Sequence, residues 1–135
     1  MLRRWVRERV KRARESNEKF YRFIEGLKRL FNDKVSIILF GSRARGDYHT
    51  GSDYDILLIA DEYPSNNIFE RISHIRSRIN IIINIQMIPL TMDEMIQSLE
   101  EGSIIVREAI ANGVLIYDGL SISQKIDELR GTIKR

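Results

Sequence analysis

Four short apolar runs, separated by stretches with helical periodicity, constrain the fold more than any other feature of the sequence. They cover residues 35–40, 54–60, 81–88 and 114–117 and consist mainly of Ile, Leu and Val. Runs of this length and composition are typical of buried strands, and Pro89 is expected to end the third. Because helical patterns alternate with these runs in a chain of 135 residues, the sequence predicts a single α/β domain.

The predicted helices are recognised by apolar residues spaced three and four apart. The first covers residues 2–31 and has its denser apolar stripe in the second half, so this half should pack on the core. The 41–53 segment is polar and rich in glycine, which predicts a loop without regular structure. Two later helices are expected to begin after Ser65 and at the Thr91–Glu94 capping box. Residues 103–112 and the tail from Ser121 are also expected to be helical.

Positive charge is concentrated at the N-terminus. The net charge of the chain is +3. Residues 1–14 contain seven Lys or Arg and only one acidic residue, Glu8, so the rest of the chain is slightly acidic. A basic arm from Arg3 to Arg14 is typical of contact with nucleic acid or an acidic partner, although a solvated helix face has the same composition. We therefore expect three parts: an N-terminal basic amphipathic helix (1–32), a central domain (33–120) and a helical tail (121–135).

Composition also excludes several kinds of chemistry. The chain has no cysteine, which excludes disulfides, thiolate zinc sites and cysteine nucleophiles. With His49 and His74 as its only histidines, a histidine-rich metal site or a Ser-His-Asp triad is not expected. No apolar run is long enough to span a membrane and the basic start lacks a signal-peptide core, so we predict a cytoplasmic protein.

A pair of carboxylates opens the second predicted strand. Asp53 and Asp55 are two residues apart, and alternate residues of a strand point to the same side, so their side chains should lie a few ångströms apart. Two carboxylates held this close repel each other unless a cation lies between them. Oxygen ligands of this kind suit Mg²⁺, which binds one or two carboxylates together with substrate phosphates.

A phosphate-binding loop is predicted where the first strand ends. Gly41 lets a phosphate approach the backbone, and Ser42 offers a hydroxyl and an amide to its oxygens. Arg43 and Arg45 follow and are placed to neutralise phosphate charge. A Gly-Ser corner beside an Asp-x-Asp pair, each attached to a hydrophobic strand, indicates metal-assisted nucleotidyl transfer.

These residues resemble a known family. Gly41-Ser42, ten residues, and then Asp53-Tyr54-Asp55 match the GSX10DXD signature of the minimal nucleotidyltransferases, the MNT group of the DNA polymerase β-like superfamily. The GSRARG opening, Ser52 and the later segments 89–95 and 107–117 are also similar, so the resemblance covers about residues 33–118.

The resemblance implies a mixed-sheet, polymerase β-like palm fold that binds Mg²⁺ and ATP on one face of the sheet. Many MNT proteins are antitoxins paired with HEPN ribonuclease toxins and transfer AMP to a toxin tyrosine. By this resemblance Gly41 and Ser42 hold the triphosphate, while Asp53 and Asp55 are the catalytic metal ligands.

One position departs from the family pattern. The third carboxylate, normally on the third strand, is replaced by Gln86, and the nearest alternative on the same face is Asn84. Neither amide can take a proton as a general base, and both are poorer metal ligands than Asp. Asp93 and Glu94 do not replace it, because helix capping accounts for them. The chain either transfers AMP slowly or has kept only nucleotide binding.

Three functions therefore follow from the sequence. The leading hypothesis is an adenylyltransferase antitoxin acting on a HEPN-type toxin. The second is an antitoxin that neutralises its partner by binding alone, and the third is an RNA-binding module with a relic nucleotide site. Whether the chain is an oligomer stays open, as does the role of Tyr54, which could stack on adenine or pack in the core. Tyr48 is a second candidate for stacking on adenine, and His49 could touch substrate.

Overall fold

The computed structural model describes residues 4–46 and 53–133, with side chains from Asn17 onward. The expectations for Tyr48, His49, Ser52 and the basic side chains between Arg3 and Arg14 therefore lie outside the described residues.

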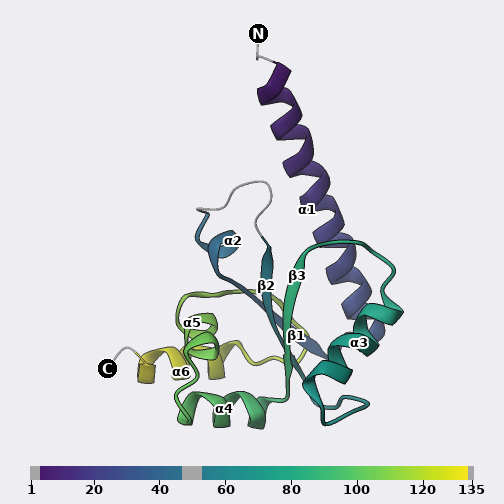
Figure 1. Cartoon of the computed structure of the whole chain (residues 1–135). Coiled ribbons are helices and arrows are strands. Elements are labelled where there is room, and N and C mark those ends of the chain that lie inside the picture. The colour runs from purple at the N-terminus through teal and green to yellow at the C-terminus, as the bar shows by residue number, and fades with distance from the viewer. Residues whose placement is uncertain (1–3, 47–52, 134–135) are drawn as a thin grey trace.

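One four-stranded mixed sheet forms the centre of the molecule (Figure 1). Its strands run in the order β3-β2-β1-β4, with β1 antiparallel to both β2 and β4, and β2 parallel to β3. The strands are β1 (Val35–Phe40), β2 (Tyr54–Ala60), β3 (Ile85–Leu90) and β4 (Val114–Asp118). The predicted α/β class and the mixed sheet implied by the family resemblance are both confirmed.

Six helices are found in the described residues: α1 (Arg4–Leu30), α2 (Ser42–Arg45), α3 (Ile68–Arg78), α4 (Met92–Glu100), α5 (Ile104–Asn112) and α6 (Ser123–Ile133). Helices α1 and α3 cover one face of the sheet, and α4, α5 and α6 cover the other. The first half of α1 projects well beyond the sheet (Figure 1). No helix in the described part of the chain combines the length and apolarity that a membrane crossing needs.

The alternation of side chains along the strands creates two separate cores. In β1, Ile37 faces α1 and α3, whereas Ile38 faces the other three helices. In β2, Ile56 and Leu57 divide in the same way. Because both faces are covered by helices, these strands are mostly apolar, with Ser36 and Asp55 as the exceptions, and the sequence shows nearly continuous apolar runs rather than alternation.

Three local features differ from the sequence prediction. The third strand covers Ile85–Leu90 rather than residues 81–88, and it includes Pro89. Proline is tolerated there because β3 is an edge strand, where one row of backbone groups needs no partner. The predicted loop after β1 begins with the short helix α2, and Asn67, not Ser65, accepts the capping hydrogen bond of α3.

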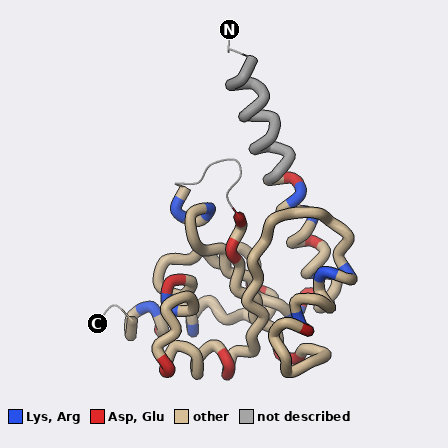
Figure 2. The backbone as a smooth tube through the Cα atoms, in the orientation of Figure 1, with Lys and Arg blue, Asp and Glu red and all other residues tan. Residues whose placement is uncertain are grey.

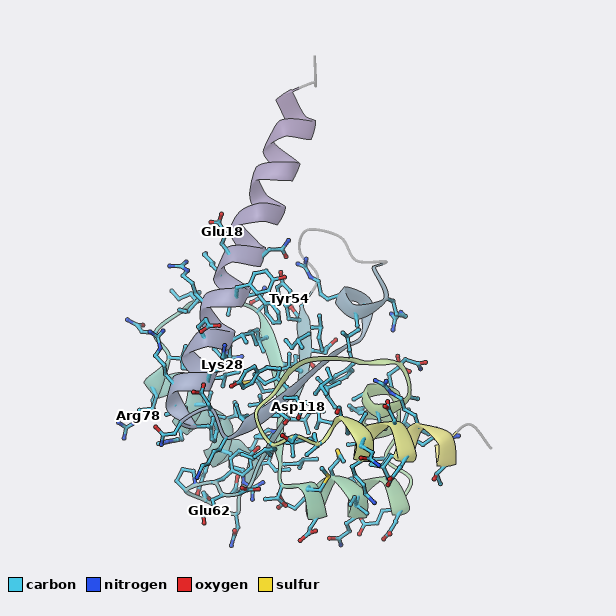
Figure 3. The ribbon with its side chains drawn as sticks, turned by 180° about the vertical axis from the view of Figure 1, so that it is seen from behind. Glu18, Lys28, Tyr54, Glu62, Arg78 and Asp118 are labelled. Atoms are coloured by element: carbon cyan, nitrogen blue, oxygen red, sulfur yellow. The ribbon has the colours of Figure 1, made fainter. Side chains whose placement is uncertain are left out.

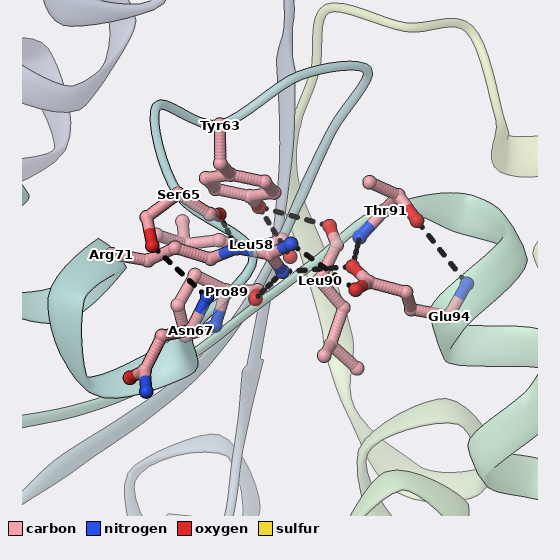
Figure 4. A network of polar contacts seen from close by, with 9 residues as sticks. All are labelled: Leu58, Tyr63, Ser65, Asn67, Arg71, Pro89, Leu90, Thr91 and Glu94. Atoms are coloured by element: carbon pink, nitrogen blue, oxygen red, sulfur yellow. Dashed lines mark hydrogen bonds and ion pairs between the residues drawn. The ribbon is translucent and has the colours of Figure 1, made fainter.

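A buried arginine ties together the end of the sheet opposite the start of β2 (Figure 4). Arg71 in α3 is 3% exposed and forms two hydrogen bonds to the Glu94 carboxylate, of 2.8 and 3.1 Å. It also donates to the carbonyls of Pro89 and Ser65 and lies over the Tyr63 ring. Its donors are shared among the loop after β2, the end of β3 and the start of α4, so this cluster is a structural clamp.

Candidate functional site

Asp53 and Asp55 lie at the start of β2, on the sheet face that α4, α5 and α6 cover. Asp55 pairs with Phe40, the last residue of β1, in the antiparallel register. The chain turns directly after Phe40, so Gly41 comes to lie against the Asp55 carboxylate. Figure 2 shows acidic positions at the start of β2 beside basic positions in α2. The sheet register thus joins the two halves of the predicted motif.

Gly41 has a backbone conformation that is nearly exclusive to glycine, with φ of 75° and ψ of −157°. A Cβ at this position would also overlap a carboxylate oxygen of Asp55. Two independent constraints therefore require glycine here: the backbone angles and the close approach to Asp55. The turn places Ser42 at the first position of α2, directly after the glycine that lies against Asp55.

The two arginines after Ser42 have different environments. Arg43 is 8% exposed, and its guanidinium lies 4.2 Å from the centre of the Tyr54 ring. Arg45 is exposed and forms an ion pair of 3.3 Å with Glu108 of α5. Its positive charge also acts on Asp55, where it opposes the rise in the carboxyl pKa that burial and Asp53 cause. Arg43 is therefore buried against Tyr54, which sequence spacing did not reveal, and its expected role in neutralising phosphate charge stays a prediction.

Burial raises the pKa of Asp55, and the charge of Asp53 raises it further, with Arg45 opposing both. A raised carboxyl pKa means that the negative charge is unfavourable where it stands. A bound cation would relieve this repulsion. The oxygen-only donor pair, its partial burial and its adjacency to Gly41 therefore fit Mg²⁺ together with the phosphates of a nucleotide.

Gln86 lies where the resemblance placed the third carboxylate. It pairs with Asp55 in the parallel register of β2 and β3, and its Nε2 donates to Asp53 Oδ2 over 3.3 Å. Asn84 precedes β3, and its carbonyl accepts from the Tyr54 amide. Within the described residues no three His, Cys, Asp or Glu side chains gather as a metal site, so an amide stands in the third position beside the two carboxylates.

Tyr54 points to the opposite face of the sheet and is 4% exposed. Its ring stacks on Phe20 of α1, and its hydroxyl donates to Asn17 Oδ1 over 2.7 Å. Phe20 and Arg43 both lie about 4.2 Å from the Tyr54 ring, so they occupy opposite faces of it. Figure 3 shows Tyr54 beside α1. The core role is confirmed for Tyr54, and Asn17 is a site-supporting residue that no sequence pattern indicated.

Comparison with known proteins identifies the family. Residues 20–110 match the model of the nucleotidyltransferase domain. A protein of Methanocaldococcus jannaschii named "putative protein adenylyltransferase" is 34% identical over 77 residues, which cover 56% of this chain and 78% of the relative. A second protein of that organism with the same description is 50% identical over 40 residues, covering 29% and 40%. The chain belongs to the nucleotidyltransferase domain family and is a nucleotidyltransferase.

Solved structures agree on the fold. A nucleotidyltransferase of Sulfolobus solfataricus, described as putative, superposes with a TM-score of 0.53 at 24% identity, covering 78% of this chain and 83% of that one. A structure titled as a toxin-antitoxin with AMP-PNP gives a TM-score of 0.50 at 20% identity, covering 83% and 82%. These structures confirm the fold that the resemblance implied, and the match to the nucleotidyltransferase domain confirms the family.

Proposed function

We propose that this protein transfers AMP from ATP to a hydroxyl group of a partner protein. The observation that carries the proposal is the Asp53–Asp55 pair held against the Gly41–Ser42 turn by the register of β1 and β2. In this proposal the transferase domain covers residues 33–120, between the N-terminal helix (1–32) and the C-terminal tail (121–135).

In this proposal the carboxylate pair binds the metal and the Gly41–Ser42 turn binds the phosphates. Asp53 and Asp55 would hold Mg²⁺, which when bound supplies positive charge to the triphosphate. Gly41 leaves room for the phosphates, and Ser42 donates to their oxygens. Arg43 holds the turn against the start of β2 through its contact with the Tyr54 ring.

The transfer itself exchanges one phosphorus–oxygen bond for another. The acceptor hydroxyl oxygen bonds to the α-phosphorus, the bond from that phosphorus to the bridging oxygen breaks, and pyrophosphate leaves. Gln86 cannot accept the hydroxyl proton because an amide is not a base at neutral pH, so this proton passes to water. An acceptor that releases its proton readily, such as a tyrosine, suits a site built in this way.

The partner in this proposal is a HEPN-type ribonuclease toxin, and the protein acts in the cytoplasm as its antitoxin. Three findings support this: the GSX10DXD motif of the MNT group, the adenylyltransferase description of the relatives, and the toxin-antitoxin description of one structural neighbour. In this proposal the partner brings its own hydroxyl group to the site.

The test is to incubate the protein with Mg²⁺, α-labelled ATP and the product of a neighbouring HEPN-type gene. We expect label on the toxin and a loss of more than 100-fold with Asp53→Asn/Asp55→Asn. Asp93→Asn, an exposed carboxylate at the start of α4, is the matched control and should transfer normally. ATP binding without any label transfer would refute the enzymatic proposal.

A second candidate is an antitoxin that works by binding alone, and the amide of Gln86 is the observation that favours it. In this case Asp53→Asn/Asp55→Asn would still neutralise the toxin, whereas the enzymatic proposal expects neutralisation to be lost. Gln86→Asp separates the two further. It restores a carboxylate beside Asp55 and should raise AMP transfer in an enzyme, but it should change nothing in a protein that only binds.

A further inference from the structure

A cationic hollow lies between α1 and the end of α3, on the face of the sheet opposite Asp53 and Asp55. It has a volume of about 430 Å³, and its lining includes Arg22 and Arg29 from α1 and Arg78 from α3. Asn80 and Ile81, in the segment after α3, line it too. Figure 3 shows Arg78 beside the lower turns of α1.

The helix crossing that forms this hollow depends on Gly26. A Cβ at Gly26 would lie 3.1 Å from Cγ2 of Ile79, which is tighter than an ordinary contact. The small residue lets α1 approach the end of α3 closely, and this approach brings Arg22 and Arg29 to the same hollow as Arg78. The three cations therefore converge because of the packing of the two helices.

The positive charge of the hollow is not neutralised within the described residues. None of its lining residues is acidic, and Arg22, Arg29 and Arg78 form no ion pair with any residue that the structure describes. Glu25, on the same helix, is paired with Lys28 at 2.9 Å. Converging like charges destabilise a folded protein unless a ligand of opposite charge binds there.

Helix dipoles explain part of this arrangement. Arg29 and Arg78 lie in the last turns of α1 and α3, where the helix dipole favours a cation. Arg22 lies two turns before the end of α1, so the dipole does not account for it. Nor does the dipole explain why side chains from two helices face one hollow.

We propose that this hollow binds the phosphate groups of single-stranded RNA. All three cations are arginines, whose planar guanidinium groups bind phosphate oxygens in pairs. Tyr21 precedes Arg22 in α1, does not itself line the hollow, and is 67% exposed; an exposed ring of this kind is a stacking surface for an unpaired base of a strand that continues beyond the hollow.

The sequence of α1 favours a nucleic acid over an acidic protein as the ligand. The N-terminal 14 residues of the chain, in which α1 begins, contain seven Lys or Arg. The helix has 27 residues and is therefore about 40 Å long. A nucleic-acid strand carries a charge at every nucleotide and so presents negative charge along this whole length. All the residues that line the hollow lie in the described part of the chain.

The experiment measures binding of the full chain to a labelled 20-nucleotide oligouridylate by fluorescence anisotropy at several KCl concentrations. Arg22→Gln/Arg78→Gln removes one cation from each helix. Arg107→Gln/Lys125→Gln, on α5 and α6, removes the same charge on the other side of the sheet and is the matched control. Thermal melting followed by circular dichroism confirms that both variants fold.

We expect the hollow variant to bind RNA about tenfold more weakly than the control variant at 0.1 M KCl. The slope of log affinity against log salt should also fall by about 1.4, since each lost phosphate contact contributes about 0.7 for a single strand. Equal affinity and slope for the two variants would overturn the proposal, as would no RNA binding by the unaltered chain. Binding of a polyglutamate peptide in place of RNA, abolished in the hollow variant, would assign the surface to an acidic protein instead.

Discussion

The ring of Tyr54 stacks on the ring of Phe20, with centroids 4.2 Å apart and planes 8° apart. Since Tyr54 stands between Asp53 and Asp55 in the sequence, this contact connects the long helix α1 directly to the candidate metal ligands. The Tyr54 hydroxyl adds a hydrogen bond to Asn17 on the same helix. Helix α1 is therefore part of the framework that fixes the start of β2.

We predict that Tyr54 positions the two carboxylates without touching the nucleotide. Tyr54→Phe keeps the stack and should retain most of the transfer activity, whereas Tyr54→Leu loses both stack and cation contact. We expect Tyr54→Leu to lower kcat and raise the Mg²⁺ concentration needed for half-maximal activity, with little change in KM for ATP. Phe69→Leu, which alters an exposed ring of α3, is the control. An equal loss in Tyr54→Phe and Tyr54→Leu would contradict a positioning role for the ring.

Gly41 should tolerate no side chain. Gly41→Ala forces alanine into a glycine-only conformation, at a cost of about 1–3 kcal/mol, and drives its Cβ against the Asp55 carboxylate. We expect a lower melting temperature and loss of ATP binding, measured by calorimetry. Gly131→Ala is the matched control, because Gly131 lies within α6 with open space around it, and alanine there should be neutral or stabilising by up to about 1 kcal/mol. Normal ATP binding by Gly41→Ala would show that the turn does not form the nucleotide site.

The pH dependence of stability should reveal the metal site without any activity assay. The pKa of Asp55 is raised by burial and by Asp53, so the metal-free protein loses stability as the pH rises above the ordinary carboxyl pKa of 3.8. Asp55→Asn lacks this loss and should melt at a higher temperature than the unaltered protein at pH 7.5.

Addition of Mg²⁺ should raise the melting temperature of the unaltered protein by several degrees at pH 7.5, because saturation at 100 times Kd adds about 2.7 kcal/mol. The increase should disappear in Asp55→Asn and should shrink as the pH is lowered toward 3.8. If Mg²⁺ shifted both proteins equally, the ion would bind elsewhere.

The clamp around Arg71 should dominate stability at the far end of the sheet. Arg71→Met leaves the carbonyls of Ser65 and Pro89 without this donor and Glu94 without its partner. Because Glu94 is partly exposed, we expect a loss of about 1–3 kcal/mol in urea unfolding, mainly from the unpaired carbonyls. The hydrogen bond from Arg71 lowers the pKa of Glu94. This contribution is therefore present above the ordinary pKa of 4.5 and is lost as the pH falls through the lowered value.

Glu94→Gln should remove this acid sensitivity while keeping the helix cap, since glutamine also completes a capping box. Asp93→Asn, one position earlier and exposed, should leave the acid limb of the stability profile unchanged. An unaltered acid limb in Glu94→Gln would show that the pair does not control this transition.

The sequence predicted the strands β1 and β2 with their bounds, because both are almost entirely buried and consist mainly of apolar residues. It also predicted the capping box of α4, because the hydrogen bonds between Thr91 and Glu94 join residues only three positions apart in the sequence. It missed the start of β3. The run of isoleucines before Ile85 has the composition of a strand, but exposed Ile82 lies outside the sheet. Pairing with β2, not composition, sets that boundary.

The nucleotidyltransferase motif and the family were determined by the sequence alone, because each is a matter of residue type and spacing; the replacement of the third carboxylate by Gln86 stays a prediction from the family pattern. Only the tertiary structure decided that Gln86 donates to Asp53, that Arg43 lies under Tyr54, and that Arg22 and Arg78 line the same hollow. These relations join residues 11 to 56 positions apart in the chain. They depend on strand register and helix packing, which are set by the whole core and leave no local pattern.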